Sequence, residues 1–378
     1  MRGNATGPSS ELGSRPEPIR VFHVGLGAMG LTIARALTRR CGFELVGAVS
    51  HQVGEDLGHL TGAGPLGPVL AELPQDPPEA ELCILATAST LAEVAETVLW
   101  GLSHGMNVIS CAEELAFPVA ADPTISASFQ AAAEQAGKTV LGTGINPGYA
   151  MDVLPICLTA PCLEVRSFRL RRVNDLAPYG PAVLDAFGVG LSLADFQEGV
   201  AAARIVGHHG FAQSIALIAQ AVGLEIDEVR QELQPIIAKA ARSGRELTVE
   251  PGRVAGCLHV AEAFTEGRLV IRMEHPQEVD PGAEGVATGD FIDIDGDPPI
   301  HARIEPEIAG GLGTAALVVN MASRVVSAPA GVLTMDRMGL PSAWLRRGFD
   351  SGPQPSPADA AVAAASTAVP TGNQRAVT

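Results

Sequence analysis

A glycine-rich turn near the start of the chain limits its possible folds more than any other feature. Gly25, Gly27 and Gly30 have the spacing Gly-x-Gly-x-x-Gly, directly after the apolar segment 19–24 and before a helical pattern. In such a strand–turn–helix unit, the first glycine permits the tight turn, the second admits a diphosphate close to the backbone, and the third lets the helix pack on the strand. This predicts a dinucleotide-binding Rossmann domain.

Two further segments are expected to line the nucleotide cleft. Ala28 and Met29 begin the helix after the glycine turn, where free backbone N–H groups and the helix dipole attract phosphate. Thr87 and Ala88 follow the third apolar strand, at the sheet edge that faces the nicotinamide in this fold. The alternative is that Ser89 or Thr90, directly after this segment, only caps the next helix.

The identity of the nucleotide depends on the end of the second strand. NAD sites commonly place an acidic residue there to bind the ribose 2′-hydroxyl, whereas this chain has Ser50 followed by His51. No carboxylate would repel a 2′-phosphate at this position, and Arg39 or Arg40 could reach it unless these arginines only cap their helix. We therefore expect NADP or NAD, with NADP slightly favoured.

The order of expected strands and helices predicts the fold class. Strands alternate with helices up to about residue 147, which is typical of an α/β Rossmann domain with a parallel sheet. Beyond it, strands at 165–174, 253–259, 268–274 and 291–294 accompany a mostly helical stretch over 193–241. This predicts a second, α+β domain with a largely antiparallel sheet. The expected parts are a disordered tail 1–18, the Rossmann domain 19–147, an α+β substrate and dimerisation domain 148–310, a C-terminal helix and segment 311–345 that packs back toward the cofactor domain, and a disordered tail 350–378.

Two segments at strand ends are candidates for chemistry. Glu113 and Glu114 follow the strand 107–110, and a carboxylate at such an edge can act as a general base or bind a cation. The alternative is an acidic pair that begins a helix. Asn146 and Pro147 follow the next strand, where Asn146 could bind the cofactor or the substrate, or only cap a hinge.

A pair of adjacent histidines is a candidate for the substrate pocket. His208 and His209 stand between Gly207 and Gly210, and histidine titrates near neutral pH. Adjacent side chains on one element point apart, and no cysteine or acidic pattern accompanies them, so we expect no metal site.

Composition excludes several classes of function. The formal net charge is −17 and no basic block is present, so nucleic-acid binding is not expected. No segment reaches the roughly 20 apolar residues that span a bilayer, so no membrane partner is expected. Six cysteines without a C-x-x-C pair and the lack of a secretory signal indicate a cytoplasmic protein.

Several motifs in the same order resemble the 2,4-diaminopentanoate dehydrogenase and native amine dehydrogenase family. The resemblance covers about residues 19–340. The motifs are Gly25 to Gly30, Cys111 to Glu114, Thr143 to Gly148 with Asp152, Gly207-His208 with Ser214-Ile215, Pro251 to Gly256, Gly310 to Asn320, and Ala330 to Met335.

The resemblance implies an enzyme that interconverts a primary amine or diamino acid with the ketone plus ammonia, using NAD or NADP. It also implies a homodimer with a second domain like that of dihydrodipicolinate reductase, and a catalytic glutamate within the pair Glu113-Glu114, with Glu113 favoured. This chain departs from the family at Ser50, which lacks the usual acid, and at Gly313-Thr314, where relatives more often carry an aspartate.

Three alternatives remain open. A dihydrodipicolinate reductase-type imine reductase would carry a lysine three residues after a His-His pair, whereas Gly210, Phe211 and Ala212 follow His209 here. A homoserine- or aspartate-semialdehyde-type dehydrogenase would have a lysine where this chain has Glu113. A protein that binds NADP without turnover is the non-enzymatic alternative.

Overall fold

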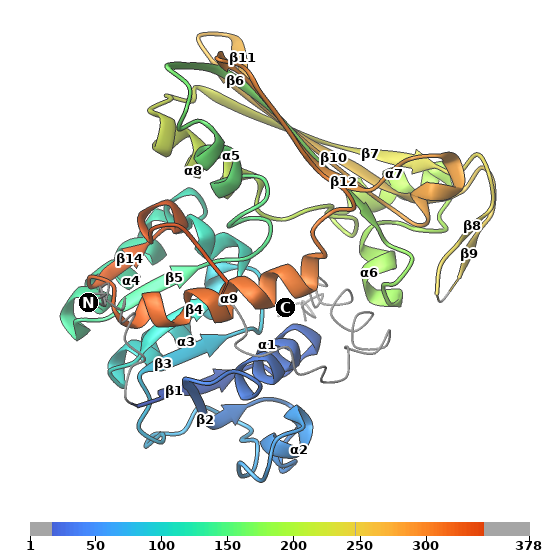
Figure 1. Ribbon diagram of the computed structural model, residues 1–378. Helices are drawn as coiled ribbons and strands as arrows, with labels where there is room; N and C mark the ends of the chain where they lie inside the picture. Colours follow the sequence, from blue (N-terminus) through green and yellow to red (C-terminus); the bar gives the residue numbers. More distant parts are fainter. Residues whose placement is uncertain (1–16, 246, 344–378) are drawn as a thin grey trace, which may run out of the picture.

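The computed structural model describes residues 17–245 and 247–343, and two six-stranded sheets organise them (Figure 1). The tails expected at 1–18 and 350–378 lie outside these residues, except for 17 and 18. None of the described helices combines the length and the apolar character needed to cross a membrane.

The first sheet is wholly parallel, in the order β14-β5-β4-β3-β1-β2. Every residue of β3, β4 and β5 is buried, because helices cover both faces of a parallel sheet. The chain runs outward from β1 to β2 and then returns to the other side of β1 with β3. The strands are β1 (Ile19–Val24), β2 (Phe43–Val49), β3 (Leu82–Leu85), β4 (Asn107–Ser110), β5 (Thr139–Gly142) and β14 (Gly331–Leu333).

Four helices cover the first sheet, two on each face (Figure 1). On one face α1 (Ala28–Thr38) packs beside α9 (Gly310–Val326), with the short α2 (Leu57–Thr61) next to α1. On the other face lie α3 (Leu91–Ser103) and α4 (Pro123–Ala136). A capping box between Thr90 and Glu93 begins α3, which stabilises the first turn by satisfying free N–H groups.

The second sheet has the order β13-β12-β6-β11-β10-β7 and is mixed. Only the pair β6 and β11 is parallel; the other four pairs are antiparallel. The predicted fold class, a parallel Rossmann sheet followed by an α+β unit with a largely antiparallel sheet, is therefore confirmed. The strands are β6 (Glu164–Asp175), β7 (Glu228–Ile237), β10 (Val254–Thr265), β11 (Arg268–Glu278), β12 (Gly289–Asp297) and β13 (Ile300–Ile304).

The prediction of helix over most of 193–241 was wrong in its last part. Helices α7 (Leu193–Ala201) and α8 (Phe211–Val222) are present, but β7 follows them as an edge strand paired with β10. Most side chains of β7 are exposed, so the strand lacks the alternation of apolar and polar residues that would reveal it. Its glutamates and glutamines favour helix locally, and the pairing with β10 overrides that preference.

Helices cover one face of the second sheet (Figure 1). Helix α8 and the short α5 (Val153–Leu158) pack against it in one apolar cluster, and α6 (Pro181–Ala186) and α7 belong to another. The opposite face carries charged side chains, including Arg169 and Arg171 of β6 and Asp293 of β12. The sheet thus presents one face to its own helices and leaves the other open.

A buried histidine in β1 predicts a loss of stability in acid. His23 is fully buried, and desolvation lowers its pKa from 6.5 to about 4. Between these pH values the unfolded chain binds a proton that the folded chain excludes, so stability falls as the pH falls from 6.5 toward 4. A shift of this size corresponds to about 3 kcal/mol.

Replacement of His23 by leucine is expected to remove this contribution. Urea unfolding at pH 7 and pH 4.5 measures it as the difference in pH dependence between the wild type and His23→Leu. Equal pH dependence in the two proteins would show that His23 is not the titrating group.

Candidate functional site

The glycine turn has the geometry that a diphosphate requires. A side chain on Gly25, whose φ is +91°, would lie 2.4 Å from the carbonyl oxygen of Ala86, and one on Gly30 would lie 1.9 Å from the carbonyl oxygen of Gly25. The same test at Gly27 finds no atom within 4 Å, and Gly27 is exposed. The outer two glycines are therefore needed for packing, and the middle one leaves space over the start of α1.

The start of α1 offers free donors beside that space. Gly27 is the N-cap, and no side chain caps the helix. The N–H groups of the first turn, which includes Ala28 and Met29, are therefore available to an anion. The residues present fit the diphosphate of NAD or NADP. Thr87 lies against Gly25, since a Cβ on that glycine would be 2.8 Å from the Thr87 methyl group, and Ala88 follows it.

The end of β2 carries Ser50 and His51 as expected, but the arginines lie elsewhere. Ser50 is buried, its hydroxyl has no hydrogen-bond partner among the described residues, and His51 beside it is exposed. The expectation that Arg39 or Arg40 could reach a phosphate here was wrong. Both follow α1, at the opposite end of β2 from Ser50, about 20 Å along a seven-residue strand. Arg40 also donates to Asn320 of α9 over 2.7 Å.

The two adjacent glutamates have different environments. Glu114 accepts a hydrogen bond from the backbone N–H of Leu91 over 2.7 Å and so satisfies a free donor at the start of α3. Glu113 instead lines a pocket between the two sheets. Burial raises the pKa of Glu113, and a hydrogen bond with Ser89 and the nearby His209 oppose that rise. A carboxyl group of this kind can exchange a proton near neutral pH.

The turn after β5 brings Asn146 into the same pocket. Asp152 shapes this turn, because its carboxylate accepts hydrogen bonds from Gly148 N–H over 2.7 Å and from the Ser214 hydroxyl over 2.8 Å. Pro147 is packed against Gly210, where a Cβ would lie 2.4 Å from the proline ring. The turn is thereby fixed to the start of α8, which is how motifs far apart in the sequence meet.

The two neighbouring histidines both line the pocket but have different neighbours. His209 lies near Glu113. The ring of His208 contacts Phe211 and His275, each with a centroid separation of 4.9 Å. Burial lowers the pKa of His208 and of His275 well below 6.5, and neighbouring charges add to this shift. Burial therefore favours the neutral form of both rings, in which one ring nitrogen is a donor and the other an acceptor.

Several pocket residues were missed by the sequence analysis. Arg172 and Asn174 come from the end of β6, and His275 and Gln277 come from the end of β11. They share one edge because these strands are parallel, with Asn174 opposite Gln277. The feature of the sequence that could have identified them is a set of polar residues at expected buried positions of two strands. The sequence does not show, however, that these two strands are neighbours in the sheet.

The pocket is rich in unpaired polar atoms. His275 Nε2 lies 2.8 Å from the side-chain oxygen of Asn174, so the neutral ring donates there and leaves Nδ1 as an acceptor. Four buried atoms lack a partner among the described residues. They are Asn146 Oδ1, His208 Nε2, His275 Nδ1 and Gln277 Oε1. Such atoms are costly unless a ligand or water bonds them.

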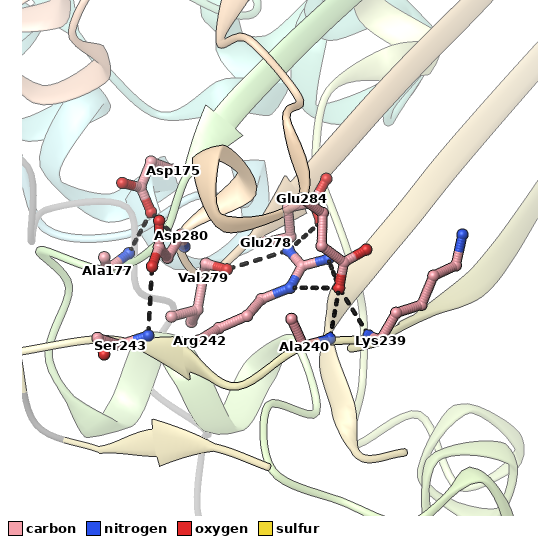
Figure 2. A network of polar contacts seen from close by, with 10 residues as sticks. All are labelled: Asp175, Ala177, Lys239, Ala240, Arg242, Ser243, Glu278, Val279, Asp280 and Glu284. Atoms are coloured by element: carbon pink, nitrogen blue, oxygen red, sulfur yellow. Dashed lines mark hydrogen bonds and ion pairs between the residues drawn. The ribbon is translucent and has the colours of Figure 1, made fainter. Parts of the chain in front are cut away.

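A buried ionic network holds the pocket end of β11 (Figure 2). Arg242, only 1% exposed, forms an ion pair with Glu278, donates to the carbonyl oxygen of Val279 over 3.1 Å, and pairs with Glu284 over 3.1 Å. Glu278 directly follows Gln277. The network therefore anchors the strand end that presents Gln277 to the pocket.

Comparison with known proteins gives consistent similarities. A sequence model of the 2,4-diaminopentanoate dehydrogenase C-terminal domain matches residues 149–350. The chain is 37% identical over 337 residues to a 2,4-diaminopentanoate dehydrogenase from Acetoanaerobium sticklandii, covering 86% of this chain and 95% of that protein. It is 23% identical to an amine dehydrogenase from Streptomyces virginiae, covering 77% and 88%. The solved structure of an amine dehydrogenase from Mycobacterium smegmatis superposes with a TM-score of 0.73 at 28% identity, covering 88% and 98%.

Proposed function

The chain belongs to the 2,4-diaminopentanoate dehydrogenase family, and we propose that it interconverts a primary amine with the corresponding ketone plus ammonia. It is an oxidoreductase that uses NAD or NADP. The observation that carries the proposal is a half-buried carboxyl group, Glu113, in a pocket at the carboxyl end of β4. The glycine turn after β1 opens at the same edge of the sheet, where ligands bind in this fold.

The pocket chemistry suits an amine substrate. An amine must lose its extra proton before its carbon can be oxidised, and Glu113 is placed to accept that proton. When bound, NAD or NADP accepts a hydride from the substrate carbon. Once Glu113 has released this proton to solvent, its carboxylate stabilises the iminium cation that remains. The unpaired acceptors of the pocket, among them His275 Nδ1, can receive the N–H bonds of the substrate.

Hydrolysis of the iminium completes the oxidation. Water adds to the carbon–nitrogen double bond, and Glu113 removes a proton from this water and returns it to the nitrogen. Glu113 then takes the remaining hydroxyl proton as ammonia leaves and the carbonyl forms. In the reverse direction ammonia adds to the ketone, and the iminium is reduced. We propose Glu113 as the acid–base group, and Glu114 as a cap of α3 that takes no part in the chemistry.

A direct assay tests the proposed function. The purified full chain is mixed with NADH or NADPH, ammonia and a panel of ketones, and the absorbance of the reduced nicotinamide is followed. We expect oxidation of the cofactor that depends on both ketone and ammonia. Turnover of a cyclic imine without ammonia would favour an imine reductase, and cofactor binding without any turnover would favour a non-catalytic protein.

We also propose a homodimer formed through the open face of the second sheet. Phe291 and Leu269 lie there among charges of both signs, including Arg272, Glu274 and Arg303. A face with mixed charges can pair with its own copy about a twofold axis. The mass in solution tests this proposal: a monomer at micromolar concentration would refute it.

A further inference from the structure

We propose that the nucleotide site prefers NAD to NADP and that Gln52 determines this preference. The inference rests on the use of a nicotinamide cofactor. Gln52 lies three residues beyond the end of β2 and close in sequence to Ser50. In this fold, the end of the second strand faces the ribose next to the adenine, which carries the 2′-phosphate in NADP.

The side chain of Gln52 is fixed in one orientation. Its amide nitrogen donates to the carbonyl oxygen of Leu26 over 3.3 Å, and Leu26 lies within the glycine turn. A carbonyl can only accept, so the nitrogen rather than the oxygen of the amide must face it. The oxygen Oε1 is buried and has no hydrogen-bond partner among the described residues. The same is true of the Ser50 hydroxyl.

This orientation favours a ribose hydroxyl over a phosphate. A 2′-hydroxyl can donate its proton to Gln52 Oε1 and satisfy it. A 2′-phosphate carries about two negative charges at neutral pH and is largely deprotonated, so it cannot donate a hydrogen bond to Gln52 Oε1. Its oxygens would instead repel the amide oxygen. Rotation of the amide to present its nitrogen would break the bond to Leu26 and place two carbonyl oxygens together.

The lack of basic residues in the sequence after Arg40 points the same way. From Cys41 to Gly137 the chain has no lysine or arginine, whereas it has 13 aspartates and glutamates. Sites for NADP commonly use an arginine to bind the 2′-phosphate. Two nearby arginines already have other partners: Arg35 of α1 donates to the carbonyl oxygen of Leu60, and Arg40, which follows α1, donates to Asn320. This reverses the preference for NADP that Ser50 alone suggested.

Cofactor titration without amine or ketone tests the inference through binding alone. NADH and NADPH are each titrated into the full chain, and calorimetry or nicotinamide fluorescence gives the Kd. We expect NADH to bind at least about tenfold more tightly, the scale of one hydrogen bond and one unfavourable contact. Equal affinity, or tighter binding of NADPH, would overturn the inference while leaving the proposed function intact. Binding of neither cofactor would overturn both.

Two variants assign the effect to Gln52. Gln52→Ala is expected to raise the Kd for NADH about tenfold and to change the Kd for NADPH less than about threefold. Gln52→Arg is expected to bind NADPH more tightly than the wild type does. The matched control is Gln220→Ala, at an exposed position of α8, which should change neither Kd. If Gln52→Ala weakened both cofactors equally, the side chain would only support the glycine turn, and the assignment would be wrong.

Discussion

Glu113→Gln is expected to lower kcat for amine oxidation by at least about a hundredfold, the usual scale of general acid–base catalysis. The amide has nearly the same shape but cannot take a proton from the amine or compensate the charge of the iminium. Cofactor affinity should change little, because Glu113 lies after β4 and away from the glycine turn. Initial rates with saturating cofactor, together with the Kd for NADH, separate these two effects.

The neighbouring residue provides the control for this prediction. Glu114→Gln keeps an oxygen that can accept from the Leu91 N–H, so it should reduce stability by at most about 1 kcal/mol and leave kcat within a few-fold of the wild type. If Glu114→Gln were the inactive variant and Glu113→Gln the active one, the proposed roles of the two residues would have to be exchanged.

Arg242→Ala is expected to destabilise the protein by about 3–5 kcal/mol, because it leaves a buried carboxylate without its partner. Glu278 is 5% exposed and Arg242 is 1% exposed, so water cannot replace the lost contact. The exposed pair of Arg230 with Glu228 offers a matched comparison, and Arg230→Ala should cost at most about 1 kcal/mol. Urea unfolding gives the free energy of unfolding of each variant.

A double variant separates two free energies: the destabilisation from leaving Glu278 buried without a partner, and the net contribution of the ion pair to stability. Arg242→Met with Glu278→Leu removes both charges, and we expect it to be more stable than Arg242→Ala alone. If the double variant were no more stable than the single one, the loss would come from packing or from the contacts to Val279 and Glu284. The KM for the amine should also rise in Arg242→Ala, since Gln277 would lose its anchor.

The sequence was most informative where local structure determines the outcome. The glycine turn, the limits of β1 and the start of α3 depend on nearby residues, through backbone conformation and capping. The second sheet was predicted through strands such as β6, which alternates exposed and buried residues. The edge strand β7 was missed because its side chains are mostly exposed, so only its partner β10 reveals it.

The candidate site was less accessible from the sequence. Glu113 and Glu114 have the same chemistry and neighbouring positions, and only the packing of the Glu114 side chain against α3 distinguishes them. The pocket side chains of β6 and β11 meet through a parallel pairing of strands about 100 residues apart. Gln52 was overlooked because its role depends on a bond to Leu26 that spans 26 residues.

The last described strand has a consequence for how the protein is made. Strand β14 completes the edge of the first sheet beside β5, and α9 covers α1, although about 190 residues separate β5 from β14 in the chain. A ribosome that has released β1 to β5 has therefore delivered a sheet that still lacks an edge strand and a covering helix. The apolar surface of α1 stays uncovered until almost the whole chain has emerged from the ribosome. We therefore expect a chaperone to bind the nascent protein at α1.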